Sequence, residues 1–241
     1  MLRVLYLMFA ALILFPVANM VVMADETAPR AADSPTLLVW GDSLSAAYGI
    51  PVEKGWVSLL QDKLGDKYAL VNASISGETT AGGLTRLPDA LETFKPAWVL
   101  LELGANDGLR GIALDEMRGN LEQMIKLAQE AEAKVVLIGI KLPPNYGQVF
   151  TDKFEAMYAE LAKQYELPLV PFLLEGVAED WDLMQADGLH PVAEAQPQVL
   201  ENVWEVLEGV LTTPSSTPAS GYSPASHNPA PAPSPPLPPA G

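Results

Sequence analysis

One serine, one histidine and one aspartate have the types and spacing that acyl-transfer chemistry needs. Ser43 follows the apolar run Leu37–Trp40 closely, in the stretch Gly-Asp-Ser-Leu-Ser. A serine hydroxyl becomes a nucleophile when a base removes its proton, and histidine is the usual base near neutral pH. The chain has two histidines, and only His190 lies before the proline-rich C-terminal end. Asp187 can accept the imidazole Nδ1 proton and fix the tautomer, so we predict a triad of Ser43, His190 and Asp187.

Three groups could donate hydrogen bonds to the oxyanion of a tetrahedral intermediate. The backbone N–H of Ser43 is one of them if a helix begins at this residue. Gly77 can bring a second N–H close to a substrate because it lacks a side chain, and Asn106 can offer its side-chain amide. Gly77 and Asn106 are also compatible with ordinary turns, since Asn-Asp-Gly is a common turn sequence. The sequence therefore indicates an oxyanion hole of Ser43, Gly77 and Asn106, with the turn interpretation open for the last two.

Five short apolar runs must supply the elements that position these residues. The runs are Thr36–Trp40, Ala69–Asn72, Trp98–Leu103, Val135–Ile140 and Leu169–Phe172. Their apolar residues are mostly consecutive, as in strands buried on both faces, and helical spacing fills segments between them. This alternation predicts parallel strands joined by right-handed crossovers, hence an α/β fold with a three-layer α/β/α sandwich around a five-stranded parallel sheet. In the flavodoxin-like order 2-1-3-4-5, the loops with Ser43, Gly77 and Asn106 meet at one crevice.

Four sequence blocks resemble the signature blocks of the SGNH, or GDSL, hydrolase family. In order they read GDSLS, NASISGETT, ELGANDG and DGLHP, and the resemblance covers Thr36 to Val210. The stretches LELGANDGLRG, LPPNYG and DGLHPVAEAQP look like the bacterial periplasmic thioesterase I, lysophospholipase and arylesterase branch. The resemblance implies the SGNH hydrolase fold and hydrolysis of acyl esters and thioesters through an acyl-enzyme, without a cofactor. It also gives the five site residues named above their roles as nucleophile, base, acid and oxyanion donors.

The substrate is expected to lie in a crevice flanked by the segments 107–114 and 141–150. Leu109, Ile112, Pro144 and Tyr146 are predicted to form an apolar trough for an acyl chain, although capping of the core explains such residues equally well. Two other functions stay open on the sequence alone. One is a carbohydrate O-acetylesterase on the same scaffold, and the other is a non-catalytic binding protein that has kept the fold.

Both ends of the chain differ in composition from the part between them. Residues 1–24 contain the positively charged Arg3, then an apolar core, and then small residues at the third-last and last positions before a cut after Ala24. This pattern is typical of a cleavable secretory signal. An uncleaved membrane anchor is the alternative. An N-terminal segment, 25–35, precedes the predicted hydrolase domain, 36–211. The segment 212–241 holds ten of the 22 prolines and is predicted to be a disordered tail. The mature protein is therefore expected in the periplasm or the medium.

Charge and cysteine content exclude several partners. The formal net charge is −16, which disfavours nucleic acid and gives no attraction to anionic membranes. The absence of cysteine excludes disulfides, thiol catalysis and an N-terminal lipid-modified cysteine. Neither a phosphate-loop lysine nor a histidine–carboxylate set with metal-ligand spacing is present. We expect a monomer that acts on a small acyl ester or thioester, with no metal.

Overall fold

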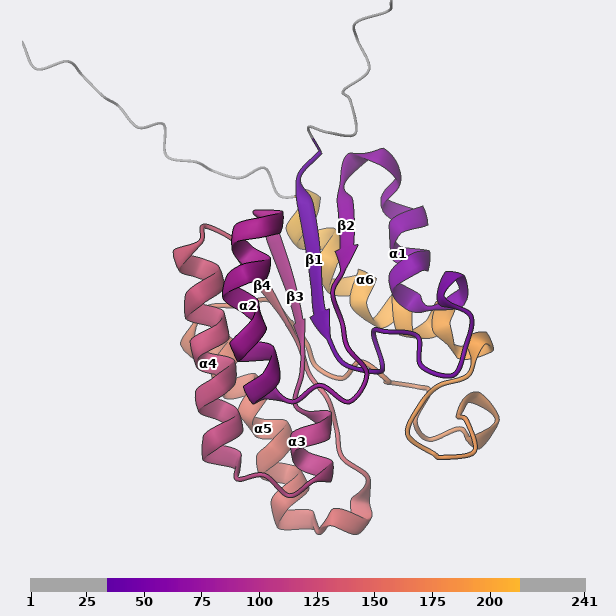
Figure 1. Ribbon diagram of the computed structural model, residues 1–241. Helices are drawn as coiled ribbons and strands as arrows, with labels where there is room; N and C mark the ends of the chain where they lie inside the picture. The colour runs from indigo at the N-terminus through magenta and orange to yellow at the C-terminus, as the bar shows by residue number, and fades with distance from the viewer. Residues whose placement is uncertain (1–33, 213–241) are drawn as a thin grey trace, which may run out of the picture.

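Five parallel strands form the central sheet in the order β2-β1-β3-β4-β5 (Figure 1). The computed structural model describes residues 34–212. The strands are β1 (Thr36–Gly41), β2 (Ala69–Asn72), β3 (Trp98–Glu102), β4 (Lys134–Ile138) and β5 (Leu169–Val170). The predicted strand order is thereby confirmed, and the observed strand ends differ from the predicted ones by at most two residues.

Helices cover both faces of this sheet. They are α1 (Trp56–Leu64), α2 (Thr80–Phe94), α3 (Ala105–Leu109), α4 (Leu114–Glu130), α5 (Gln148–Gln164) and α6 (Gln196–Thr212). Short 3₁₀ turns are η1 (Val52–Lys54), η2 (Gly65–Lys67), η3 (Pro144–Tyr146), η4 (Trp181–Leu183) and η5 (Ala193–Ala195). In Figure 1, α1 and α6 lie on one side of the sheet and α2, α4 and α5 on the other, so the predicted three layers are confirmed.

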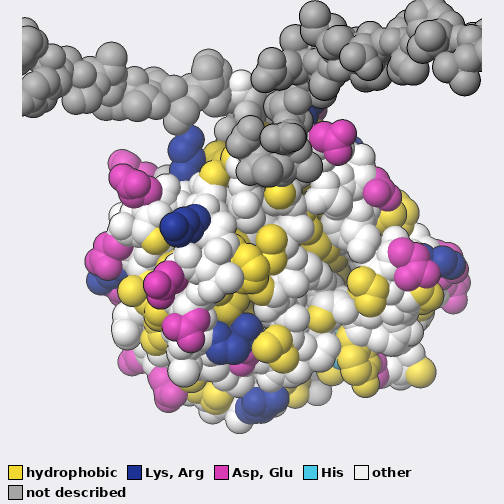
Figure 2. All heavy atoms as spheres, turned by 45° about the horizontal axis from the view of Figure 1, so that its top comes forward, with side chains coloured by type: hydrophobic (Ala, Val, Ile, Leu, Met, Phe, Trp, Pro, Cys, Tyr) yellow, Lys and Arg dark blue, Asp and Glu magenta, His cyan; other side chains and the backbone are white. Residues whose placement is uncertain are grey.

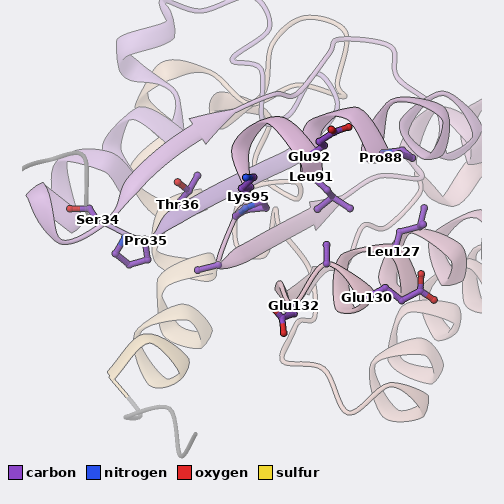
Figure 3. Close-up of a pocket in the computed structure, with 13 residues that line it drawn as sticks. Ser34, Pro35, Thr36, Pro88, Leu91, Glu92, Lys95, Leu127, Glu130 and Glu132 are labelled. Atoms are coloured by element: carbon purple, nitrogen blue, oxygen red, sulfur yellow. The ribbon is translucent and has the colours of Figure 1, made fainter.

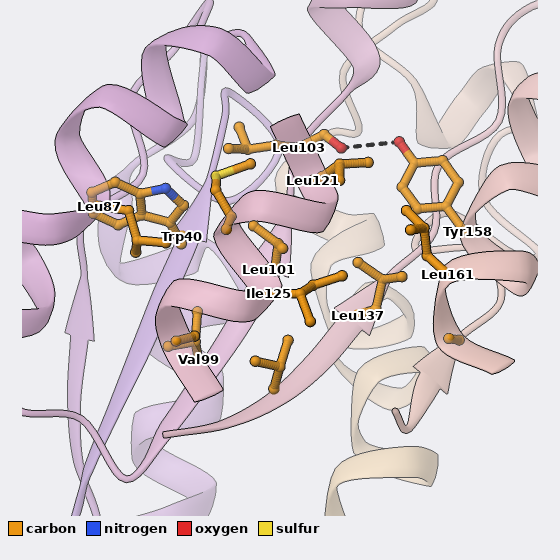
Figure 4. Close-up of a cluster of buried hydrophobic side chains, with 14 of the residues drawn as sticks. Trp40, Leu87, Val99, Leu101, Leu103, Leu121, Ile125, Leu137, Tyr158 and Leu161 are labelled. Carbon is orange, nitrogen blue, oxygen red and sulfur yellow. Dashed lines mark hydrogen bonds between the residues drawn. The ribbon is translucent and has the colours of Figure 1, made fainter. Parts of the chain in front are cut away.

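The alternation of side chains along β1 supplies both hydrophobic cores at once. Leu38 and Trp40 belong to the core beneath α2, α4 and α5, whereas Leu37 and Val39 belong to the core beneath α1 and α6. Successive residues of a strand point to opposite faces, so a strand buried on both faces must be apolar at every position. Figure 4 shows the first of these cores, where the Tyr158 hydroxyl donates to the Leu103 carbonyl oxygen at 2.9 Å. This packing fixes the carboxyl end of β3.

The last strand is shorter than the sequence predicts because its pairing with β4 becomes irregular after Val170. We predicted a strand over Leu169–Phe172, but β5 ends at Val170. The Gly139 N–H donates to the Val170 carbonyl oxygen at 2.8 Å, but the N–H that donates to the Gly139 carbonyl oxygen is that of Leu173, at 2.9 Å, and not that of Phe172 as a regular parallel ladder requires. Pro171, which has no N–H to donate, directly follows β5, an edge strand of the sheet, where proline is tolerated.

Some sequence predictions concern parts of the chain outside the described residues. The predicted signal, 1–24, and residues 213–241 of the predicted tail lie there, as does His227; Thr212 is the last residue of α6. Within residues 34–212, no helix combines the length and the hydrophobicity needed to cross a bilayer. Figure 2 shows the amino end of the sheet, where Asp and Glu side chains are spread between Lys and Arg side chains.

A hollow of about 790 Å³ lies at this amino end (Figure 3). Prolines, aliphatic residues and carboxylates line it, including Pro88, Leu91, Glu92 and Glu130, together with Lys95. Among its lining residues there is no histidine to act as a base beside a hydroxyl. Ligands of open parallel sheets bind beyond the opposite, carboxyl ends of the strands, where the predicted site residues lie.

Candidate active site

Ser43 lies in a turn at the carboxyl end of β1. One carboxylate oxygen of Asp42 accepts the Leu44 N–H at 3.0 Å, and the Asp42 carbonyl accepts the Ala46 N–H at 3.0 Å. The helix that the sequence analysis allowed at Ser43 is not formed. Ala47 and Gly49 have positive φ angles of 57° and 75°, which a right-handed helix cannot continue through. The nucleophile turn, residues 42–49, is therefore an irregular segment fixed by its own hydrogen bonds.

His190 reaches this turn from a loop 147 residues later in the chain. Its Nε2 lies 2.8 Å from Ser43 Oγ, and its Nδ1 lies 2.7 Å from an Asp187 carboxylate oxygen. Both distances are within hydrogen-bond range, so a proton can pass from the serine hydroxyl to the imidazole. The structure thus brings together the three residues that the sequence analysis selected for this chemistry.

Asp187 is held by its own loop in the orientation that the histidine needs. Its other carboxylate oxygen accepts the backbone N–H groups of Leu189 at 2.9 Å and His190 at 3.1 Å. Burial alone would raise the pKa of Asp187, but these hydrogen bonds and the contact with the His190 ring outweigh it and lower the pKa. The group is therefore a carboxylate at neutral pH, as an acceptor of the Nδ1 proton must be.

Further contacts hold the imidazole and its loop in place. The Tyr48 ring packs against the His190 ring with their centroids 4.5 Å apart. The Gln185 N–H donates to the His190 carbonyl oxygen at 2.7 Å, and the Gln185 side-chain amide donates to the Tyr48 carbonyl oxygen at 2.8 Å. The nucleophile turn and the histidine loop are thus joined through Tyr48 as well as through the contact between Ser43 and His190.

Asn106 enters the site from α3 with its amide held by a buried carboxylate. The Asn106 Nδ2 donates to the second oxygen of Asp42 at 3.1 Å. Asp42 is fully buried, and this burial raises its pKa to about 6 despite hydrogen bonds from Leu44 and Asn106 and the nearby His190 charge. An amide has two hydrogens on this nitrogen, so the second one remains available for a substrate oxygen.

Gly77 lies in the loop after β2, close in sequence to a residue that is hydrogen-bonded to the end of β1. The Glu78 N–H donates to the Ile75 carbonyl at 3.0 Å, and Gly77 has a φ of +81° as the third residue of this turn. Such a turn favours glycine at that position because a side chain would be strained there. The Ile75 N–H donates to the Gly41 carbonyl at 3.1 Å, which ties this loop to the end of β1.

Two neighbouring cavities open beside Ser43. The smaller, of about 160 Å³, is lined by Ser43, Asn106, His190 and apolar residues; Gly77 is not among them. The larger, of about 590 Å³, shares the side chains of Leu109, Lys141, Leu142, Pro143, Leu174 and Leu189 with it. Of the four predicted trough residues, three line the larger cavity, namely Leu109, Pro144 and Tyr146. The fourth, Ile112, lines neither cavity.

A family model matches the part of the chain that carries this geometry. The GDSL-like Lipase/Acylhydrolase family model covers residues 39–196. The chain belongs to this family. It is therefore a hydrolase of carboxylic ester bonds, and the fold and the family that the sequence analysis expected are both confirmed.

Individual relatives of this GDSL hydrolase support the same conclusion. Esterase TesA of Pseudomonas aeruginosa is 49% identical over 83% of this chain and 99% of its own length. Thioesterase 1/protease 1/lysophospholipase L1 of Escherichia coli K12 is 45% identical over 76% of this chain and 88% of its own length. The crystal structure of the esterase EstA from Pseudoalteromonas sp., inhibited by monoethylphosphonate, superposes with a TM-score of 0.70 at 42% identity, covering 74% and 99% of the two chains.

Sequence reasoning missed two side chains in the site of this GDSL hydrolase. Tyr48, which packs on His190, gives no signal, because nothing in the sequence places position 48 beside position 190. Glu102, which accepts a hydrogen bond from Ser45, does leave a signal in the sequence. It is an ionisable residue inside an apolar run, and a strand buried on both faces must bury it there.

Proposed function

We propose that this GDSL hydrolase cleaves acyl esters and thioesters by forming an acyl-enzyme on Ser43. The observation that carries the proposal is the unbroken pair of contacts from Ser43 Oγ to His190 Nε2 at 2.8 Å and from His190 Nδ1 to Asp187 at 2.7 Å. A nucleophile, a base and a group that orients the base, in this geometry, make up the machinery of acyl transfer.

The proposed reaction has two halves. In the first, His190 takes the proton of Ser43, Oγ bonds to the acyl carbon, and the carbonyl oxygen becomes an oxyanion. This oxyanion accepts hydrogen bonds from Asn106 Nδ2 and from the backbone N–H groups of Ser43 and Gly77. The carbonyl reforms as the carbon–oxygen or carbon–sulfur bond breaks, and His190 gives its proton to the leaving group. In the second half, His190 takes a proton from water as the water oxygen attacks the acyl carbon. The bond between the acyl carbon and Ser43 Oγ then breaks, His190 returns the proton to Oγ, and the acid leaves.

Acyl chains of substantial length are the substrates that fit the larger cavity. Its apolar lining begins at Leu109, which also lines the cavity beside Ser43, and continues to Pro144 and Tyr146. Relatives named as an arylesterase and as a thioesterase and lysophospholipase support activity on aryl esters, thioesters and lysophospholipids. Burial of each methylene contributes about 0.8 kcal/mol, so a long chain would gain the most from this trough.

We expect Leu109→Ala to weaken turnover of long-chain esters selectively. Removal of this side chain takes apolar contact from the chain but none from an acetyl group, so kcat/KM for a decanoyl ester should fall about tenfold or more. The measurement is a p-nitrophenyl ester series from acetyl to decanoyl. Ile112→Ala is the matched control, since Ile112 lies outside both cavities and should change all esters equally. Equal losses on acetyl and decanoyl esters in the Leu109 variant would count against the trough, and a preference for acetylated sugars would favour an O-acetylesterase.

A fluorophosphonate probe tests the assignment of the nucleophile. The probe should form one adduct, and peptide mapping by mass spectrometry should place it on Ser43. Ser58 is a useful internal reference, because its hydroxyl donates to the Val52 carbonyl and makes no hydrogen bond with His190, so it should stay unmodified. An unlabelled protein, or an adduct at another serine, would remove the basis of the proposal.

We also propose that the protein is exported and that it acts as a monomer. The composition of residues 1–24 supports cleavage after Ala24, and N-terminal sequencing of the exported chain would test it. All proposed site residues come from one chain, which supports activity as a monomer that size-exclusion chromatography can check.

A further inference from the structure

Glu102 is a fully buried carboxyl group that the acyl-transfer steps do not use. It is the last residue of β3 and lies directly behind the nucleophile turn. One of its oxygens, Oε2, lies 2.7 Å from Ser45 Oγ and accepts the Asp42 N–H at 3.2 Å. The other oxygen, Oε1, is buried without a hydrogen-bond partner among the described residues. The group thus contacts the residues on both sides of Ser43.

The chain at Gly41 is shaped around this carboxyl group. A Cβ atom at Gly41 would lie 2.5 Å from Glu102 Oε2 and 2.8 Å from Ser45 Oγ. Contacts this short do not occur between real atoms of this kind, so any larger residue would displace either the carboxyl group or the serine. The glycine of the Gly-Asp-Ser stretch is therefore required by the contact between Glu102 and Ser45.

Asp42 and Glu102 form a buried acidic pair in which the two members have different partners. Both Asp42 oxygens accept N–H groups, from Leu44 and Asn106, and only the ionised form offers two acceptor oxygens without a proton. The hydroxyl of Ser45 can donate or accept, so Glu102 can keep this contact when it is protonated. Desolvation raises the pKa of Glu102 well above its usual value, and the charge of Asp42 raises it further.

The surroundings of the pair offer compensation for one negative charge only. The other ionisable groups that act on it are Asp107 from α3, Tyr158 from α5 and His190 from the loop before α6. Only His190 can carry a positive charge, and it acts on Asp42. Two uncompensated carboxylates this deep in the protein would be strongly destabilising. The charge therefore belongs on Asp42 and the proton on Glu102.

We propose that Glu102 is a positioning residue, held as the neutral acid, that fixes Ser43 by anchoring the turn through Ser45 and the Asp42 amide. The proposal rests on the proposed role of Ser43 as the nucleophile. A serine oxygen that is free to move by about 1 Å from its reactive position can lose on the order of 10²-fold in rate. Glu102 restricts that movement through its contacts with Ser45 and the Asp42 amide, while His190 contacts Ser43 Oγ itself.

Substitutions that separate charge from hydrogen bonding test this role. Glu102→Gln keeps an acceptor oxygen for Ser45 and the Asp42 amide, so kcat should stay near that of the wild type. Glu102→Leu removes the acceptor and should lower kcat on the order of 10²-fold with little change in KM. Ser45→Ala removes one of the two contacts and should lower kcat less, which keeps the test available if the Leu variant does not fold. Tyr158→Phe is the control, since it removes a buried hydrogen bond to Leu103 at the same end of β3 but keeps the contacts of Glu102 with Ser45 and the Asp42 amide.

Two further measurements test the protonation state of Glu102. Because the pKa of Glu102 is raised on folding, the wild type should lose free energy of unfolding as the pH rises from 4.5 toward the raised value. Glu102→Gln lacks this loss, so its stability relative to the wild type should improve as the pH rises above 4.5. An infrared carbonyl band of a neutral carboxylic acid at neutral pH should be present in the wild type and Tyr158→Phe, and absent in Glu102→Gln.

Several results would overturn the proposal. One is a kcat of Glu102→Gln as low as that of Glu102→Leu. Another is a kcat of Ser45→Ala equal to that of the wild type or of Tyr158→Phe. The third is the absence of an infrared band of a neutral carboxylic acid in the wild type. Failure of the proposed function itself looks different. Ser43→Ala would then stay active and the fluorophosphonate adduct would lie elsewhere, whereas failure of the Glu102 role leaves both of those results unchanged.

Discussion

Replacing Ser43 by alanine should lower kcat for p-nitrophenyl esters on the order of 10⁶-fold, the cost of losing the nucleophile in a serine hydrolase. The reason is chemical, because no other oxygen lies within hydrogen-bond distance of His190 Nε2 in the contacts that define the site. Ser43 is half-buried and its side chain is small, so the thermal midpoint should hardly change. The measurement is steady-state turnover together with a melting curve of the same preparation.

The control for this variant is another serine with a hydrogen-bonded hydroxyl. Ser58→Ala removes a contact of 2.7 Å to the Val52 carbonyl at the start of α1 and should leave kcat unchanged. Retention of more than a small fraction of activity in Ser43→Ala, with trace wild-type enzyme excluded by active-site titration, would mean that acyl transfer does not use this hydroxyl.

Replacing Asn106 by alanine should lower kcat by about 10²–10³-fold, or roughly 3–4 kcal/mol of transition-state stabilisation. The amide binds the oxyanion only as negative charge develops, so KM should change far less than kcat. Asn106→Asp should be slower still, because it removes the donor and places a second carboxylate against Asp42, 3.1 Å from the present amide nitrogen. Steady-state kinetics of the purified variants on one ester would measure both effects.

Asn202 provides the matched control for this prediction. Its amide nitrogen donates two hydrogen bonds of 2.9 Å, to the carbonyls of Leu173 and Glu175, on the far side of the sheet from α3. Asn202→Ala should therefore reduce stability without changing kcat. A rise in KM with an unchanged kcat in Asn106→Ala would indicate that the amide binds the ground state and the transition state equally and does not act on the oxyanion.

The local pattern of the sequence predicted the sheet well. Each strand of an open parallel sheet is buried on both faces, so its apolar residues are consecutive and stand out from the helical spacing around them. The same pattern failed where a local feature stopped an element early. The pairing of β5 with β4 became irregular after Val170, and the positive φ of Ala47 and Gly49 prevented a helix after Ser43.

The sequence by itself determined which residues could do the chemistry. A single histidine before the proline-rich end, a nearby aspartate and a serine after the first strand leave few alternatives for acyl transfer, and four ordered blocks point to one family. These features are local, so each can be found within a window of a few residues.

Only the tertiary structure decided how those residues meet. The 2.8 Å contact between Ser43 and His190, the ring of Tyr48 on the imidazole, and the position of Ile112 outside both cavities all join or separate residues far apart in the chain. The buried partnership of Asp42 with Glu102 is of the same kind. Burial and charge compensation depend on every element packed around a group, and a sequence window contains only one of those elements.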